Sequence, residues 1–158
     1  MKLLVIDLKS KWCFIVLILF YISLVLFVSF VGVCSFYPGR LDGIYTGVSH
    51  NFVPFATIGT YLFNIHSYNS ATWFYNTFGV VLLFIPIGVL ISLLLPKLKN
   101  ALTIVLILMF SLTIESVQYV TQLGVFDVDD IMLNSLGGFI GILFFSYLKR
   151  KRLFKRVR

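Results

Sequence analysis

The sequence predicts an all-α integral membrane protein with about four transmembrane helices and a short re-entrant or interfacial segment in the outer loop. Three observations support this fold class. Hydrophobic residues make up 59% of the 158 residues and charged residues 12%, which is about half the charged fraction of a soluble domain. Four apolar runs reach the roughly 20 residues that a bilayer requires. Basic residues cluster beside these runs.

The predicted helices cover four ranges, and short polar segments separate most of them. The first helix follows three lysines, and its apolar run is too long for a cleavable signal peptide. Pro96, in "PKLKN", ends the second helix because its ring interrupts the hydrogen-bond ladder. We expect one domain over residues 1–158, ending in a basic cytoplasmic tail. The helices are predicted at 12–36, 76–95, 101–120 and 131–148, the outer loop at 37–75 and the tail at 149–158.

The longest loop contains an apolar stretch that is too short to cross the membrane. Residues 52–64 are nearly all apolar or small, but they are only about two-thirds of the length of a span. Such a stretch is typical of a helix that lies in the interface or enters the membrane and returns.

Basic residues predict the orientation. Twelve of the thirteen Lys and Arg residues fall on one side of a four-helix arrangement, and only Arg40 falls on the other. The positive-inside rule then places both termini of a multi-pass cell-membrane protein in the cytoplasm. The expected partners are the lipid bilayer and, at the basic tail, anionic lipids. We expect no nucleic-acid partner, because no binding motif accompanies the tail.

This orientation puts most of the acidic residues outside the cell. The stretch "DVDDIMLNSLGGFIG" carries three aspartates at the outer end of the last helix. Asp129 or Asp130 as N-cap would explain one carboxylate, but not three. "DVDD" also resembles the start of a calcium loop, although the later glycine and glutamate are absent, so a metal site stays open.

Polar residues within the predicted helices share faces. Ser111, Glu115 and Gln118 recur at helical spacing, and Glu115 lies about 9 Å below the outer end of its helix. Asp130 and Asn134 share a face with two glycines that suit close helix packing. These faces could meet and line a pocket that opens to the extracytoplasmic surface. Asn51, in the loop, is the candidate residue to close that pocket.

Two carboxylates in such a pocket could act as acid and base, and we therefore take Glu115 and Asp130 as a hypothetical catalytic pair. The alternative is a protonated Glu115 that hydrogen bonds between helices as a packing element. No cofactor is predicted. The hypothetical substrate-binding residues are Asn51, Asn76, Gln118, Asp127 and Asn134.

Four motifs, taken in order, resemble the VanZ-like family of bacterial membrane proteins. They are "NFVPF" with "TIG", then "NTFGVVLLFIPIG", then "IESVQ", then "GVFDVDDIMLNSLGGFIG". The resemblance implies a small multi-helix membrane protein, and the naming member is linked to teicoplanin resistance in Gram-positive bacteria. The matching positions are Asn51, Pro54, Asn76, Phe84, Pro86, Gly88, Glu115, Gln118, Asp127, Asp130, Asn134 and Gly137.

The chain departs from this pattern at two positions. Val80 stands where many members have asparagine, and Val125 where many have an arginine before the acidic motif. Arg40 is the candidate to replace that arginine as counter-charge.

Several functions fit these features. The resemblance implies a role at the extracytoplasmic membrane–wall interface, in lipoglycopeptide (teicoplanin) resistance or envelope maintenance. Alternatives are a membrane-embedded enzyme that acts on a lipid-linked envelope substrate through Glu115 and Asp130, a small transporter, or a partner-binding protein. A lipid-linked cell-wall precursor and a lipoglycopeptide are the candidate envelope partners. The sequence does not specify the oligomeric state.

Overall fold

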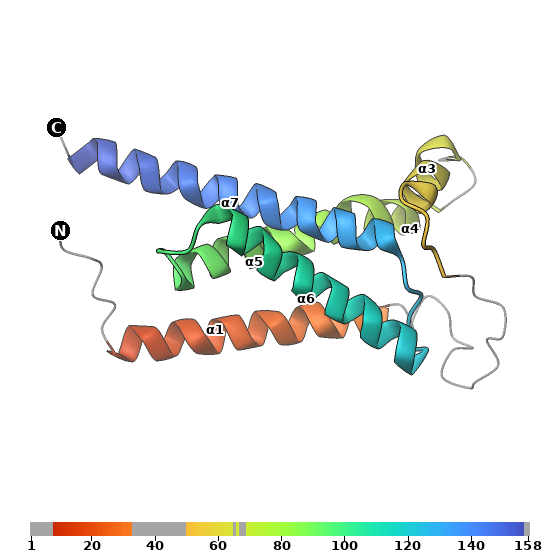
Figure 1. The fold of residues 1–158 in the computed structure, drawn as a ribbon, viewed down its shortest axis with the longest axis horizontal. Coiled ribbons are helices and arrows are strands. Elements are labelled where there is room, and N and C mark those ends of the chain that lie inside the picture. The colour runs from red at the N-terminus through yellow and green to blue at the C-terminus, as the bar shows by residue number, and fades with distance from the viewer. Residues whose placement is uncertain (1–7, 33–49, 65, 67–68, 157–158) are drawn as a thin grey trace.

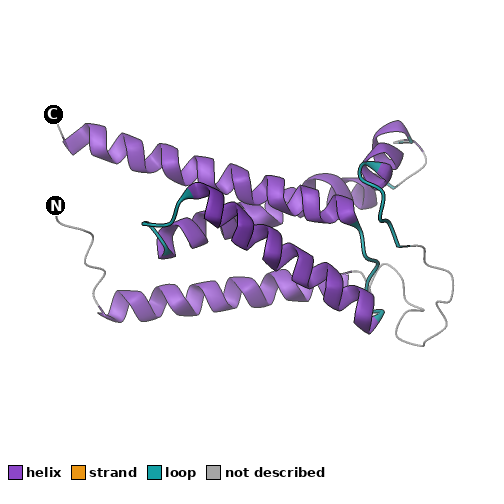
Figure 2. Cartoon of the chain, viewed as in Figure 1, coloured by secondary structure: helices purple, strands orange, loops and turns teal. Residues whose placement is uncertain are grey.

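The computed structural model describes residues 8–32, 50–64, 66 and 69–156, and every regular element in these ranges is helical (Figures 1 and 2). The described helices α1, α5, α6 and α7 run along the long axis of the bundle, and the short α3 lies at one end (Figure 1). The structure confirms the predicted all-α membrane fold with about four long helices. Arg40, the candidate counter-charge, lies outside the described residues.

The first helix, α1, covers Leu8–Phe27 and continues as a π-helical turn, η1, over Val28–Gly32. Its contact with the bundle is narrow. Val25 is fully buried in the core, and the Tyr21 hydroxyl donates a 2.8 Å hydrogen bond to the Leu83 carbonyl of a neighbouring helix. Most other side chains of α1 stay exposed to the surroundings of the bundle.

The second and third spans agree closely with the sequence prediction. Helix α4 (Ser70–Phe74), the π turn η3 (Tyr75–Gly79) and α5 (Val80–Leu94) form one continuous rod, and α6 covers Asn100–Thr121. The turn between them is closed by the Leu98 amide, which donates to the Leu95 carbonyl at 2.9 Å.

The last helix, α7, is longer than predicted. It runs over Val128–Arg156, whereas the apolar pattern indicated residues 131–148. The basic tail contains neither Gly nor Pro after residue 148, so nothing in it interrupts the hydrogen-bond ladder. Helix α7 packs most extensively on α5 and then on α6.

Glycines let α5 and α7 approach until their backbones touch. A Cβ built on Gly137 would lie 2.2 Å from the Val81 carbonyl oxygen, and one on Gly88 would lie 2.0 Å from the Gly138 carbonyl oxygen. This small-residue contact is a usual way for membrane helices to pack without a hydrophobic driving force between them. The core beside it consists of Val25, Phe84, Ile87, Ile107, Ile114 and Ile142.

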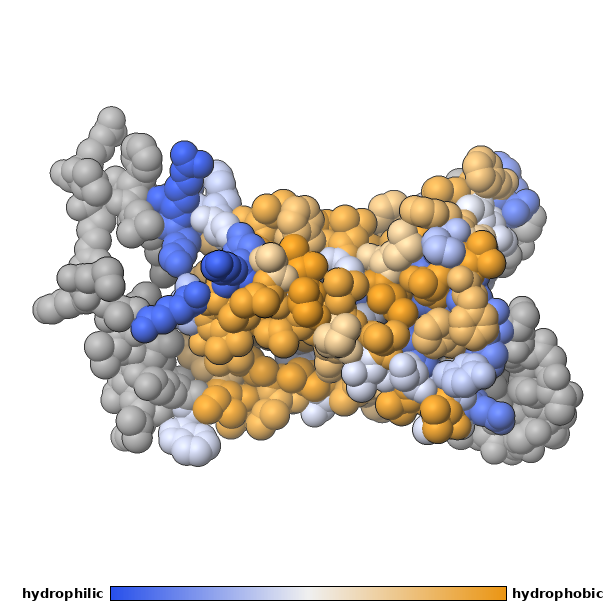
Figure 3. Space-filling model, in the orientation of Figure 1, coloured by the Kyte–Doolittle hydropathy of each residue, from blue (hydrophilic) through white to orange (hydrophobic). Residues whose placement is uncertain are grey.

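Three described helical stretches are long and apolar enough to cross a membrane, namely Tyr75–Leu94, Asn100–Thr121 and Val128–Lys151, and Phe14–Phe30 is a shorter apolar stretch. On the face shown in Figure 3, hydrophobic residues cover the middle of the molecule, and hydrophilic residues gather towards its ends. We call the end with Lys97, Lys99, Lys149, Arg150 and Lys151 the basic end. The opposite end, with Glu115, Asp127, Asp129 and Asp130, is the acidic end.

Candidate functional site

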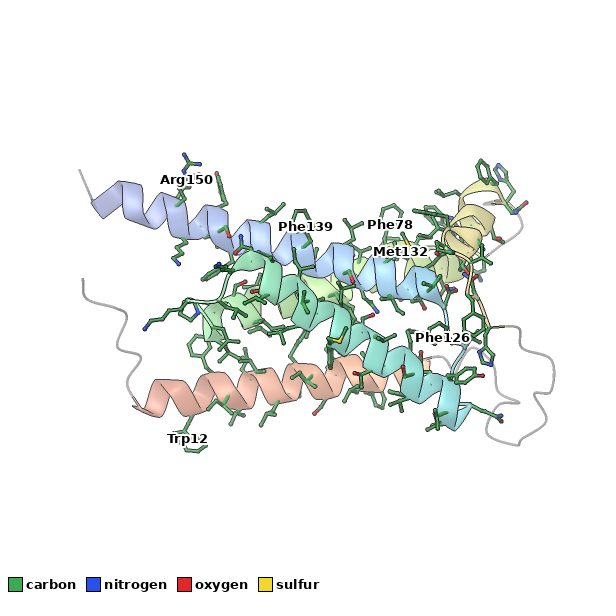
Figure 4. The ribbon with its side chains drawn as sticks, in the orientation of Figure 1. Trp12, Phe78, Phe126, Met132, Phe139 and Arg150 are labelled. Carbon is green, nitrogen blue, oxygen red and sulfur yellow. The ribbon has the colours of Figure 1, made fainter. Side chains whose placement is uncertain are left out.

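The segment before α7 is joined to a segment far away in the sequence. Asn51 and Asp127 form an isolated parallel β-bridge, in which the Asn51 amide donates to the Phe126 carbonyl at 2.8 Å. The Val128 amide donates back to the Asn51 carbonyl at 3.1 Å. The bridge places Asn51 at the start of α7, and its role in closing a pocket stays a prediction. Phe126 marks this end in Figure 4, opposite Trp12 and Arg150.

Asp127 caps α7, which corrects the prediction that Asp129 or Asp130 would do so. Its Oδ1 atom accepts from the Asp129 amide at 2.8 Å and from Asn51 Nδ2 at 2.8 Å. Its Oδ2 atom accepts from the Thr57 hydroxyl at 2.6 Å. The cap lies two or three residues earlier than predicted because α7 begins at Val128 rather than near residue 131.

Asp129 turns away from its own helix and caps another one. Helix α3 covers Ala56–Phe63, directly after Phe55, whose φ of 66° is left-handed. The Asp129 carboxylate accepts from the Phe55 amide at 2.5 Å, the Thr57 amide at 2.8 Å and the Ile58 amide at 3.0 Å. Asp129 has no exposed surface. A carboxylate at a helix N-terminus satisfies free amides and interacts favourably with the helix dipole.

Helices α6 and α7 run antiparallel with a regular polar register. Asn134 Nδ2 donates to Ser111 Oγ at 2.8 Å, and Gly138, one turn further along α7, packs on Ile107. One turn in the other direction, the same register brings Glu115 opposite Asp130. The structure therefore places the two hypothetical catalytic carboxylates on facing positions of neighbouring helices.

These two carboxylates differ from Asp127 and Asp129 in their hydrogen bonding. Glu115 is 3% exposed, and its Oε2 atom accepts from the Asp127 amide at 3.0 Å. Asp130 is half-buried, and within the described part of the chain its carboxylate has no hydrogen bond or ion pair. Asn134 is 5% exposed, and its Oδ1 atom is buried with no hydrogen-bond donor among the described residues. Acceptor oxygens are thus left over on this α6–α7 face.

Gln118 and Asn76 make their hydrogen bonds outside the carboxylate network. Gln118 Nε2 donates to the Ser29 carbonyl at 2.9 Å, a group in the π-helical turn that follows α1. Asn76 Nδ2 donates to the Tyr61 hydroxyl at 2.8 Å, which ties α3 to η3. Their assignment as substrate-binding residues stays a prediction.

Sequence reasoning missed Asp129 and Thr57 as members of the site. Both act through partners about 70 residues away, since Thr57 bonds Asp127 and Asp129 bonds the start of α3. The one local signal was that "DVDD" has more carboxylates than a single helix cap requires.

The acidic residues that the structure describes are not arranged as a group of metal ligands. Within the described ranges, no three or more His, Cys, Asp or Glu side chains are arranged to hold a metal ion. The carboxylates of Asp127 and Asp129 are directed to amide and hydroxyl donors instead.

Comparison with known proteins decides the family. A VanZ/LLP1 family profile matches residues 13–150, which is most of the chain and includes the whole acidic end. The chain belongs to the VanZ/LLP1 family. It is 29% identical over 77 residues to Protein VanZ of Enterococcus faecium, an alignment that covers 46% of this chain and 48% of that protein. The chain therefore spans about half the length of this VanZ relative. No solved structure matches it.

Proposed function

We propose that this VanZ/LLP1 member acts at the extracytoplasmic membrane–wall interface, where it contributes to lipoglycopeptide (teicoplanin) resistance or to envelope maintenance. The observation that carries the proposal is the separation of charge along the bundle. Lys97, Lys99 and Lys149 lie at one end, and the hydrogen-bonded carboxylates lie at the other. The positive-inside rule then makes the acidic end the outer one and both termini cytoplasmic.

The acidic end holds an ordered and largely buried polar cluster near the depth of the lipid headgroups. The Asp127 and Asp129 carboxylates are held by donors from residues 51–58, and Glu115 accepts from the Asp127 amide, so Glu115 and Asp130 are carried on a fixed scaffold. A preorganised polar site of this kind suits an envelope component that reaches the membrane surface, such as a lipid-linked cell-wall precursor, or the lipoglycopeptide itself.

The test is a paired assay in a sensitive Gram-positive host. Wild type, Glu115→Gln and Asp130→Asn are scored in the same cells for membrane abundance and teicoplanin susceptibility. Thr113→Val is the matched control, because Thr113 is exposed on α6 and bonds only to its own helix. We expect both amide variants to lose resistance at wild-type abundance, and the control to keep it.

Two outcomes would count against the proposal. If wild type does not shift susceptibility at all, the resistance role is wrong. If abundance falls together with resistance in both amide variants, the carboxylates serve to hold the bundle together. Reporter fusions at both termini test the orientation separately, and an extracytoplasmic signal at either terminus would contradict it.

A second candidate function is an enzyme acting on a lipid-linked envelope substrate. The facing positions of Glu115 and Asp130 favour it, since among the described residues the Asp130 carboxylate has no hydrogen bond and the nearby Asn134 Oδ1 atom has no donor. One carboxyl group could deliver a proton while the other accepts one. Membranes containing Glu115→Gln should then lack a lipid-linked product that wild-type membranes accumulate, and identical lipid profiles would exclude this candidate.

A further inference from the structure

Helix α3 has its polar face turned inwards. Thr57 donates to the Asp127 carboxylate, and the amides of Thr57 and Ile58 donate to Asp129. Tyr61, one turn after Thr57, accepts at its carbonyl from Trp73 Nε1 at 3.0 Å. The side of α3 that faces the protein is therefore held mainly by hydrogen bonds.

The opposite face of α3 is apolar and is largely exposed, with no packing partner among the described residues. Phe55, Gly59, Leu62 and Phe63 recur at the i, i+4, i+7, i+8 spacing of one helical face. Phe55 is 63% exposed, Leu62 55% and Phe63 89%. We call these four residues the α3 stripe. Phe52, just before the helix, is 63% exposed and extends the apolar surface.

This pattern is the reverse of what water favours. A surface helix in water buries its apolar stripe and exposes its polar face. Residues 51–76 contain no Asp, Glu, Lys or Arg that would hold the exposed side in water. Asp129 accepts the amides at the start of α3, so the helix presents few unsatisfied donors to an apolar environment.

The position of the bilayer is set by the long helices. Span Tyr75–Leu94 begins, and span Asn100–Thr121 ends, at the acidic end, where α3 also lies across the bundle (Figure 1). The start of the first of these spans carries exposed aromatic side chains, with Phe74 44%, Tyr75 56% and Phe78 53% exposed. Aromatic side chains gather where a membrane helix meets the headgroup region. Lipid at that boundary therefore adjoins α3.

We propose that the α3 stripe inserts into the headgroup–acyl boundary of the leaflet at the acidic end, as an interfacial helix held to α7 by Asp129. Its partner is phospholipid rather than a second copy of the chain, because the bilayer must already surround the spans on which α3 rests. A helix of this kind buries its apolar face about 5–10 Å into the boundary. The inference goes beyond the proposed function and does not depend on it.

The test uses the full-length chain in phospholipid vesicles, with Cys13 and Cys34 replaced by alanine. Single cysteines at Phe63 and, in a second variant, at Leu62 carry an environment-sensitive fluorophore. Asn64 is the matched control, since it is exposed and lies on the other side of the helix. Phe63→Cys changes a side chain that is 89% exposed, so the fold should be retained.

We expect a nitroxide near the phospholipid headgroup to quench the labels at Phe63 and Leu62 several-fold more strongly than the label at Asn64. Aqueous iodide should show the opposite order. Iodide quenching at Phe63 equal to that at Asn64 would overturn the proposal. So would strongest quenching by a nitroxide at the bilayer centre, which indicates a re-entrant segment. Shielding from both quenchers that disappears when labelled protein is diluted with lipid would instead reveal a second copy on the stripe.

Discussion

On its α5 side α7 presents glycines to the backbone of its neighbour, whereas on its α6 side it presents Asp130 and Asn134 to polar side chains. The glycine side leaves no space for one further carbon atom at Gly137 or Gly141. The polar side contains a buried amide oxygen, Asn134 Oδ1, for which the described residues supply no donor. The contrast indicates that stability comes mainly from the first side, while the second keeps unused hydrogen-bonding capacity.

The largest effect is expected on the glycine side. A Cβ on Gly141 would lie 2.1 Å from the Ile85 carbonyl oxygen, and a backbone atom cannot move aside as a flexible side chain can. Gly141→Ala should therefore lower stability by about 3 kcal/mol or more, measured as a lower melting temperature in detergent. Gly59→Ala is the control, because its Cβ would meet only a Phe63 ring atom at 4.0 Å. If the Gly141→Ala protein has the same melting temperature as wild type, α5 and α7 are less tightly packed than described.

The second-largest effect is expected for substitution of Asp129, because its carboxylate joins α7 to the start of α3. Asp129→Ala removes the acceptor of three amides at the start of α3, which should cost about 2–3 kcal/mol and make residues 50–64 sensitive to protease. Asp129→Asn keeps one acceptor oxygen and should fall between alanine and wild type. If both variants resist protease like wild type, Asp129 does not hold α3 in place.

A double-mutant cycle sharpens the comparison on the polar side. Ser111→Ala leaves the buried Asn134 amide without its partner and should cost about 1–3 kcal/mol. Adding Asn134→Leu removes the stranded amide and should restore most of the melting temperature. Additive losses in the double variant would contradict this account. If the double variant regains stability but not resistance, Ser111 and Asn134 have a role in function as well as in stability.

The smallest effect is expected at α1. Tyr21→Phe removes one half-buried hydrogen bond to the Leu83 carbonyl and should cost about 0.5–1.5 kcal/mol. Thermal melts in detergent, with Ser23→Ala as the control for a hydroxyl that bonds only within α1, can resolve the difference. A loss as large as that of Gly141→Ala would show that α1 contributes to the core as much as α5 does.

The sequence was most informative where length and composition decide the structure. The spans predicted at 76–95 and 101–120 differ by about one residue from Tyr75–Leu94 and Asn100–Thr121, since proline and lysine mark the turn between them. The end of α7 was predicted too early, because a basic tail without a helix breaker looks the same in sequence whether it is coiled or helical. The apolar stretch at 52–64 became the helix Ala56–Phe63.

The site was predicted less completely, because its contacts are not local. Helical spacing placed Glu115 and Asp130 on inward faces, and the fold brings them opposite each other. The same spacing grouped Gln118 with them, but its amide reaches the Ser29 carbonyl instead. The role of Asp129 depends on a left-handed Phe55 and on a helix far away in the sequence, which no periodic pattern encodes.

The bridge between Asn51 and Asp127 also constrains when this end of the molecule can be completed. The two residues are 76 positions apart, and the two spans Tyr75–Leu94 and Asn100–Thr121 lie between them in the sequence. While the ribosome is still making α5 and α6, the amides at the start of α3 have no carboxylate to meet. The contacts at the acidic end therefore form last, after the final helix has entered the bilayer. A nascent chain that stops before α7 cannot form them.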